Sequence, residues 1–92
     1  MKAIIIGKLV ATKGVAYEMQ NNSEFESFVR KSFSRHSSGD WGDLCEEDKA
    51  YNDYALEHGE RLFSAYENET TKIWIITEHD RSATTILFPE EY

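Results

Sequence analysis

Cysteine and long apolar runs are nearly missing from this sequence. Its one cysteine, Cys45, forms no disulfide within the chain, whereas small secreted domains usually carry several cysteine pairs. The longest apolar runs, residues 3–6 and 73–76, are far shorter than the roughly 20 residues that span a bilayer. No signal-peptide pattern follows Met1. We therefore expect a cytoplasmic protein that does not enter a membrane.

Nucleotide- and cofactor-binding fingerprints are missing as well. The chain contains no P-loop, no Gly-x-Gly-x-x-Gly, no Cys-x-x-Cys and no Gly-x-Ser-x-Gly motif. It also has no internal repeat and no Gly/Ser-rich linker. Its 92 residues suit one domain rather than two. The sequence therefore predicts a single domain over residues 1–92, without a cofactor.

Basic residues are scarce in the middle of the chain. Residues 40–60 hold one base, Lys49, and eight acids, so this segment alone carries a charge of −7, equal to the net charge of the chain. A surface of this kind repels phosphate backbones and attracts a basic partner. It can equally be a solvated helix face that keeps the protein soluble. The eight acids are Asp40, Asp43, Glu46, Glu47, Asp48, Asp53, Glu57 and Glu60.

The apolar pattern predicts a strand followed by helices. Residues 3–11 are rich in β-branched and apolar residues, which alternate on both sides; this pattern favours a strand covered on both faces or lying within the sheet. Residues 12–22 fit one helical turn or a short strand. Ser23 then begins a helix through a capping box with Glu26. The apolar stripe of that helix is Phe25, Phe28, Val29 and Phe33.

A second helix and three strands complete the predicted fold. Asp43 is expected to cap the helix, with Glu46 as its box partner, and Gly59 to end it. From residue 60 the apolar period changes to two, which predicts strands at 61–66, 72–77 and 83–88. The fold class is therefore α+β: a C-terminal antiparallel meander, an N-terminal strand, and two helices, or three with a short extra one, on one face. The buried side of the second helix is expected to hold Leu44, Tyr51, Tyr54 and Ala55, with His58 at its end.

Polar residues gather in two predicted loops. One loop holds His36, Asp40 and Asp43, which supply ligand types for a metal, although the expected capping role of Asp43 argues against a metal site. The other loop holds Glu78, Asp80 and Arg81, a combination suited either to acid–base chemistry and anion binding or to a self-bonded turn. Trp41 stands between two glycines. We expect it to be mostly buried between the helices and the sheet, with its indole N–H bonded to a carbonyl or carboxylate.

Five short motifs stand out in the second half of the chain: Gly-Asp-Trp-Gly-Asp-Leu (39–44), Trp-Ile-Ile-Thr-Glu (74–78), Asp-Arg-Ser (80–82), Thr-Thr (84–85) and Pro-Glu-Glu-Tyr (89–92). Together they resemble a family of small proteins encoded on plasmids and integrative elements. The resemblance runs from His36 to the end of the chain, and some members of the family are labelled type I restriction methyltransferase subunits. This chain lacks the Gly-rich strand–turn–helix expected for binding S-adenosylmethionine. The resemblance implies a mobile-element setting, in which small acidic proteins often block restriction or CRISPR systems.

The sequence leaves two functions open, one of a binding protein and one of an enzyme. The first is a non-catalytic acidic inhibitor that binds a basic, nucleic-acid-binding host protein and does not itself bind nucleic acid. The second is a small metal-dependent or acid–base hydrolase that uses either polar loop. The candidate binding residues for the first function are Asp40, Trp41, Asp43, Glu46, Glu47, Asp48, Asp53, Asp80 and Arg81.

Overall fold

A mixed four-stranded sheet with strand order β1-β4-β3-β2 forms the centre of the molecule in the computed structural model, which describes residues 4–92. Strands β2, β3 and β4 form the predicted antiparallel meander, and β1 joins β4 in parallel. The predicted α+β class is confirmed, although the sheet is not antiparallel throughout. The strands are β1 (Lys8–Ala11), β2 (Leu62–Glu67), β3 (Lys72–Thr77) and β4 (Ala83–Leu87).

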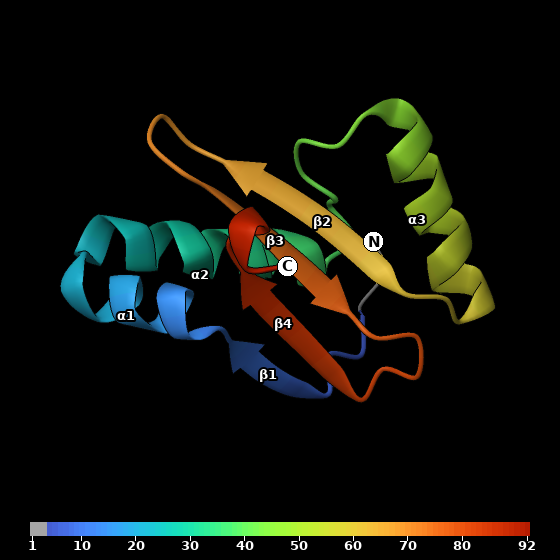
Figure 1. The fold of residues 1–92 in the computed structure, drawn as a ribbon. Coiled ribbons are helices and arrows are strands. Elements are labelled where there is room, and N and C mark those ends of the chain that lie inside the picture. The colour runs from blue at the N-terminus through green and yellow to red at the C-terminus, as the bar shows by residue number, and fades with distance from the viewer. Residues whose placement is uncertain (1–3) are drawn as a thin grey trace.

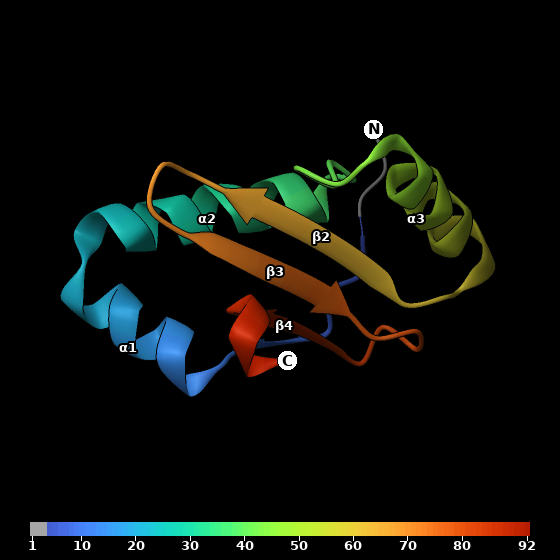
Figure 2. The ribbon, with the colours of Figure 1, turned by 45° about the horizontal axis from the view of Figure 1, so that its top comes forward.

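Helices cover one side of this sheet. Helices α1 (Lys13–Asn21) and α2 (Ser23–Ser37) lie across one face, and the short 3-10 helix η1 (Pro89–Glu91) lies on the other (Figures 1 and 2). Helix α3 (Glu46–His58) packs beside the edge strand β2. Residues 12–22, left open by the sequence, thus mostly form the extra helix. No helix among the described residues is long and apolar enough to cross a bilayer.

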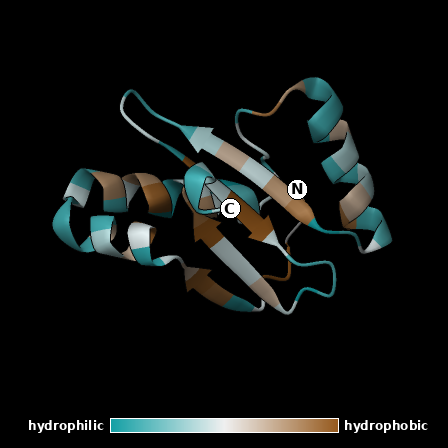
Figure 3. Cartoon of the chain, viewed as in Figure 1, coloured by the Kyte–Doolittle hydropathy of each residue, from teal (hydrophilic) through white to brown (hydrophobic). Residues whose placement is uncertain are grey.

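The main core lies between the sheet and the first two helices. The predicted stripe of α2 is confirmed: Phe25 and Val29 are buried, and Phe28 and Phe33 pack against the same cluster. Because strand residues alternate between faces, β3 directs Ile73 and Ile75 toward these helices. Figure 3 shows the hydrophobic colour in β1, in β3, at the end of β4 and in parts of α2. The cluster of buried residues is Val15, Phe25, Val29, Tyr66, Ile73, Ile75 and Ile86.

The first strand departs from its prediction. It covers Lys8–Ala11 and pairs only with β4, at the edge of the sheet, whereas a strand at 3–11 was expected to be covered or central. Leu9 is 50% exposed, so this strand is not covered on both faces. Alternating apolar residues report that a strand forms, but its position in the sheet depends on pairing with residues more than 70 positions away. Residue 3 lies outside the described part of the chain.

Both predicted helix caps are wrong. The side chain of Asn22, not of Ser23, accepts the Phe25 N–H and caps α2. Helix α3 begins at Glu46 after Cys45, which makes no capping bond, so Asp43 is not its cap. Asp43 has a long-range partner instead, which local sequence spacing does not reveal. Gly59 does end α3, as expected, and it adopts the left-handed conformation that is common for glycine at this position.

Trp41 is buried as predicted. The residue is 4% exposed and belongs to a second apolar cluster with Ala55 of α3 and Leu62 of β2. Its Nε1–H donates to Oδ1 of Asp53 at 2.9 Å, and its ring meets His36 edge to face at 5.9 Å. Trp41 therefore joins α2, α3 and β2 and is not free to act as a surface anchor.

Replacing Trp41 with alanine should lower the free energy of unfolding by about 3–5 kcal/mol, because a large buried ring and its hydrogen bond are lost. Urea unfolding followed by circular dichroism measures this change. Tyr17→Ala, which removes an exposed aromatic from α1, serves as the control and should change stability by less than about 1 kcal/mol. Equal stability of the two variants would contradict the structural role of Trp41.

Candidate functional site

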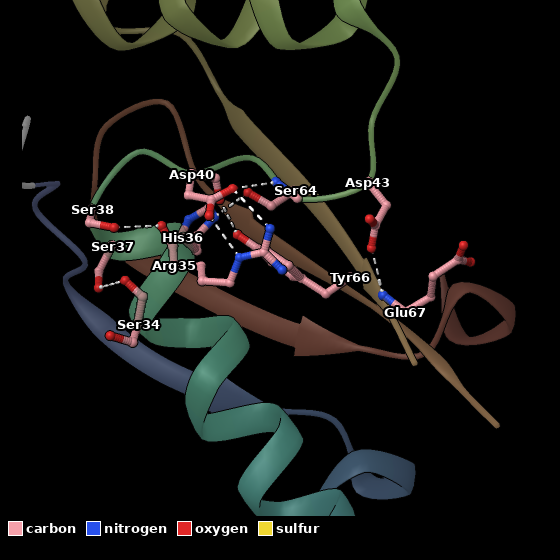
Figure 4. Close-up of polar contacts among 11 residues, drawn as sticks. Ser34, Arg35, His36, Ser37, Ser38, Asp40, Asp43, Ser64, Tyr66 and Glu67 are labelled. Carbon is pink, nitrogen blue, oxygen red and sulfur yellow. Dashed lines mark hydrogen bonds and ion pairs between the residues drawn. The ribbon is translucent and has the colours of Figure 1, made fainter. Parts of the chain in front are cut away.

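The segment 41–43 closes the open edge of β2. Asp43 donates its backbone N–H to the Ala65 carbonyl at 2.7 Å, and Ala65 donates to the Trp41 carbonyl at 3.4 Å. The Asp43 carboxylate accepts the Glu67 N–H at 2.9 Å (Figure 4). Gly42 permits this approach, because a Cβ on it would lie 2.1 Å from the Ala65 oxygen, and its φ is +79°. The Gly-Asp-Trp-Gly-Asp-Leu motif thus covers an edge strand that would otherwise offer free backbone groups.

Asp40 holds the start of this segment on α2. Its carboxylate accepts two hydrogen bonds from Arg35, at 2.7 and 3.2 Å, and one from the Gly42 N–H at 3.1 Å. The Tyr66 hydroxyl donates to the Asp40 carbonyl, and the Arg35 guanidinium lies over the Tyr66 ring (Figure 4). Hydrogen bonds from Arg35 hold the pKa of Asp40 below its ordinary value. These contacts commit Asp40 to the fold.

Asn52 anchors α3 to the same strand edge. Its side-chain oxygen accepts the Phe63 N–H at 3.1 Å, and its side-chain nitrogen donates to the Phe63 carbonyl. One side chain thereby supplies both bonds that a neighbouring strand would supply. Asp53 alongside it accepts the Trp41 indole N–H. No bond from Asn52 to β2 was predicted; its position in line with Ala55 on the helix was the only signal in the sequence for this role.

His36 belongs to a buried polar row that crosses the sheet. Thr84 donates to the Ile6 carbonyl at 2.8 Å and, having one hydroxyl hydrogen, accepts from Thr77 at 2.7 Å. Thr77 in turn accepts from His36 Nε2–H at 2.8 Å, which leaves Nδ1 to accept from the Ser64 hydroxyl at 2.6 Å. The row therefore assigns one neutral tautomer to His36.

Burial keeps His36 neutral at ordinary pH. The side chain is fully buried, and desolvation, helped by the positive charge of Arg81, lowers its pKa from 6.5 to about 4. Both ring nitrogens already have partners, so the imidazole offers no free lone pair. His36, Asp40 and Asp43 do not converge, and residues 4–92 contain no group of three His, Cys, Asp or Glu side chains placed to hold a metal.

Arg81 joins the β3–β4 turn to the end of α3. Its guanidinium donates to the carbonyls of Glu60 at 2.6 Å, Glu78 at 3.1 Å and Ala55 at 3.3 Å. Asp80 accepts the Ser82 N–H, as a self-bonded turn would. The Asp-Arg-Ser motif therefore shapes the turn and caps carbonyls at the end of α3.

Three predicted contact residues at the start of α3 remain open to solvent. Glu46, Glu47 and Asp48 are exposed, and within residues 4–92 their carboxylates form no hydrogen bond or ion pair. Figure 3 shows this end of α3 in the hydrophilic colour. Carboxylates in a first turn also favour the helix dipole. Unlike Asp40, Asp43 and Asp53, these residues have no bonding role in the fold.

An exposed aromatic row runs along the same helix, where the sequence predicted a buried stripe. Tyr51 is 57% and Tyr54 is 52% exposed. The rings of Tyr51 and Tyr54 stack at 6.2 Å, and those of Tyr54 and His58 at 3.9 Å. The prediction is confirmed for Ala55 and wrong for the two tyrosines, because α3 buries the line through Asn52 and Ala55, which follows from the bonds of Asn52 to β2. We call Tyr51, Tyr54 and His58 the aromatic row.

A cleft of about 510 Å³ opens between α3 and the free face of the sheet. Its floor is aromatic: Trp74 packs edge to face with Phe63 at 5.1 Å and with Tyr92 at 5.7 Å. We call this hollow the α3 cleft. It shares Asp48 with the acidic first turn and Tyr51 with the aromatic row. Its lining is Leu44, Asp48, Tyr51, Asn52, Glu60, Arg61, Phe63, Trp74, Ile76 and Tyr92.

Comparison with protein-family models, curated proteins and solved structures finds no match for this chain. The resemblance at residues 36–92 therefore stays an expectation. What the site can do follows from its own chemistry: unbonded carboxylates, exposed aromatic rings and an adjoining aromatic cleft.

Lowering the pH from about 6.5 to about 4 should reduce the free energy of unfolding by about 3 kcal/mol through His36 alone. In this window the unfolded chain binds a proton at His36 while the folded chain does not, so stability is full above the unfolded pKa and falls below it. Urea unfolding at a series of pH values measures the slope.

The control for this slope is a pair of histidine variants. His36→Gln should be less stable at neutral pH but should show a smaller loss between pH 6.5 and 4 than the parent chain. His79→Gln, at an exposed position, should keep the parent slope. A His36→Gln profile parallel to that of the parent chain would rule out the linkage.

Proposed function

We propose that this chain is a non-catalytic acidic protein that binds and inhibits a basic, nucleic-acid-binding protein. The observation that carries the proposal is the surface of α3, where three unbonded carboxylates (Glu46, Glu47, Asp48) adjoin an exposed aromatic row. The resemblance to proteins of plasmids and integrative elements supports a host defence target of the restriction or CRISPR type. We call the three carboxylates and the aromatic row together the α3 surface.

Charge and aromatic area have separate roles in this surface. All eight acids of residues 40–60 are exposed, so the helix and its leading loop present a strong negative field, which speeds the approach of a basic partner. Tyrosine rings then supply contact area at a low entropy cost. Arginine and lysine side chains bind both to carboxylates and to ring faces. A basic groove that normally holds phosphate offers both kinds of group.

Inhibition follows from competition for that groove. A partner that uses lysines and arginines to hold nucleic acid cannot hold α3 and phosphates with the same side chains. Two arginines of this chain, Arg35 and Arg81, are engaged in internal bonds, and the net charge is −7. Binding to nucleic acid itself is therefore disfavoured.

The hydrolase alternative gains no support from the side-chain positions. His36 is buried with both ring nitrogens bonded, and Arg81 is directed to backbone carbonyls. A nucleophile-activating or proton-transferring group must reach its substrate within hydrogen-bond distance. The side-chain positions therefore favour inhibitory binding over hydrolysis.

Removing the three carboxylates should abolish most binding to a basic target. We expect purified restriction and CRISPR effector proteins to be retained by the immobilised chain at low salt and released at high salt, because the attraction is screened. The triple variant Glu46→Gln, Glu47→Gln, Asp48→Asn should lose that retention. Retention is measured by quantitative pull-down across a salt series, together with nuclease activity of the effector.

The matched control carries the same charge change elsewhere. Glu67→Gln, Glu69→Gln and Glu90→Gln lie away from α3 and are exposed, so this variant should bind like the parent chain. Thermal melting of both variants checks that α3 stays folded, since first-turn acids contribute about 0.3–1 kcal/mol each. The proposal fails if no effector of the panel is retained at low salt, or if both variants lose binding equally.

A further inference from the structure

We infer that the α3 cleft holds one arginine side chain of the bound partner. The inference rests on the proposed function and names the contact that gives it specificity. The cleft lies directly beside the α3 surface, because Asp48 and Tyr51 belong to both. A basic protein drawn to the acidic helix therefore meets this hollow first.

The shape and lining of the cleft suit a flat, partly apolar group. Its volume of about 510 Å³ falls in the range of ligand sites in proteins. Trp74 and Phe63 form an aromatic floor in edge-to-face contact, and Tyr51 stands on the α3 wall with more than half of its surface exposed. An arginine side chain fits such a site, since its stem packs on apolar walls and its guanidinium plane stacks on ring faces.

The charges around the cleft favour a cation. Asp48 and Glu60 line it from the two ends of α3. The one basic residue of the lining, Arg61, is directed to Tyr92: its Nη2 donates to the hydroxyl at 2.9 Å, and its guanidinium lies 5.4 Å from the ring centroid. The chain thus already places one guanidinium on an aromatic ring of this wall. The carboxylates of Asp48 and Glu60 remain in the lining to bind the guanidinium of a partner's arginine.

Arginine suits these groups better than lysine. Its planar fork can bond a carboxylate in bidentate fashion while its face stacks on an aromatic ring. An ammonium group is a more strongly hydrated point charge and gains less from ring faces. The cleft contains both carboxylates and exposed rings. The preference for arginine over lysine arises because arginine can bind both groups at once.

The experiment uses three short capped peptides with the full chain at low salt. They are acetyl-Gly-Arg-Gly-amide, its lysine counterpart, and its citrulline counterpart, which keeps the shape of arginine without the charge. Two-dimensional NMR follows the two indole N–H signals. The Trp74 signal should shift with the arginine peptide while that of buried Trp41 stays in place. Affinity should fall from arginine to lysine to citrulline.

Variants locate the peptide within the cleft. Asp48→Asn should weaken arginine-peptide binding about threefold, and Tyr51→Leu about fivefold. Tyr54→Leu, which alters the aromatic row outside the cleft lining, should weaken it less than Tyr51→Leu. Glu69→Gln and Tyr17→Leu, both remote from α3, serve as controls for charge and for ring loss.

Each outcome separates this inference from the proposed function. If the arginine peptide shifts no Trp74 signal, or if citrulline binds as well as arginine, the cleft does not hold an arginine, even where effectors still bind α3 in the pull-down. If the peptide binds in the cleft and no effector is retained, the cleft is an arginine site but the proposed inhibition fails. A Trp74 shift lost in Tyr51→Leu and kept in Tyr17→Leu supports the inference.

Discussion

The rest of the structure depends on how the edge of β2 is closed. An uncovered edge strand exposes a row of backbone donors and acceptors to other chains. Within residues 4–92 no further strand covers it. Segment 41–43 and the Asn52 side chain bond to Phe63, Ala65 and Glu67 in turn. Because those bonds bring the 39–44 loop and α3 to the same strand, they determine which face of α3 is buried and which faces solvent.

The geometry of this closure separates the acidic residues that position other parts of the fold from the acidic residues that do not. Asp40, Asp43 and Asp53 are exposed, yet each accepts a hydrogen bond that positions Arg35, Glu67 or Trp41. On the far side, Arg81 bonds the end of α3 to the β3–β4 turn. With α3 held along β2 and at its C-terminal end, its first turn, aromatic row and cleft form one continuous surface. Groups that are already held in place lose less entropy when they bind a partner.

Much of the fold could be predicted from the sequence because it depends on neighbours in the chain. The stripe of Phe25, Phe28, Val29 and Phe33 repeats at helical spacing, and strand 72–77 alternates between faces, so each pattern carries its own period. The burial of Trp41, which lies between two glycines, could be predicted because a sharp turn leaves so large a ring few possible orientations. The exposed face of α3 could not be predicted. Tyrosine occurs both buried and exposed, and helical periodicity alone placed Tyr51 and Tyr54 on the buried side.

By itself, the sequence determined the α+β class, the meander, the α2 stripe, the end of α3 at Gly59 and the −7 charge of residues 40–60. Only the tertiary structure decided that β1 is an edge strand, that Asp43 bonds β2 instead of capping α3, and that the aromatic row faces solvent. It also formed the cleft, whose lining comes from segments as far apart as Leu44 and Tyr92. The physical reason is range: propensity and period act over a few residues, whereas the partner of a carboxylate or the lining of a cavity is set by contacts between distant segments.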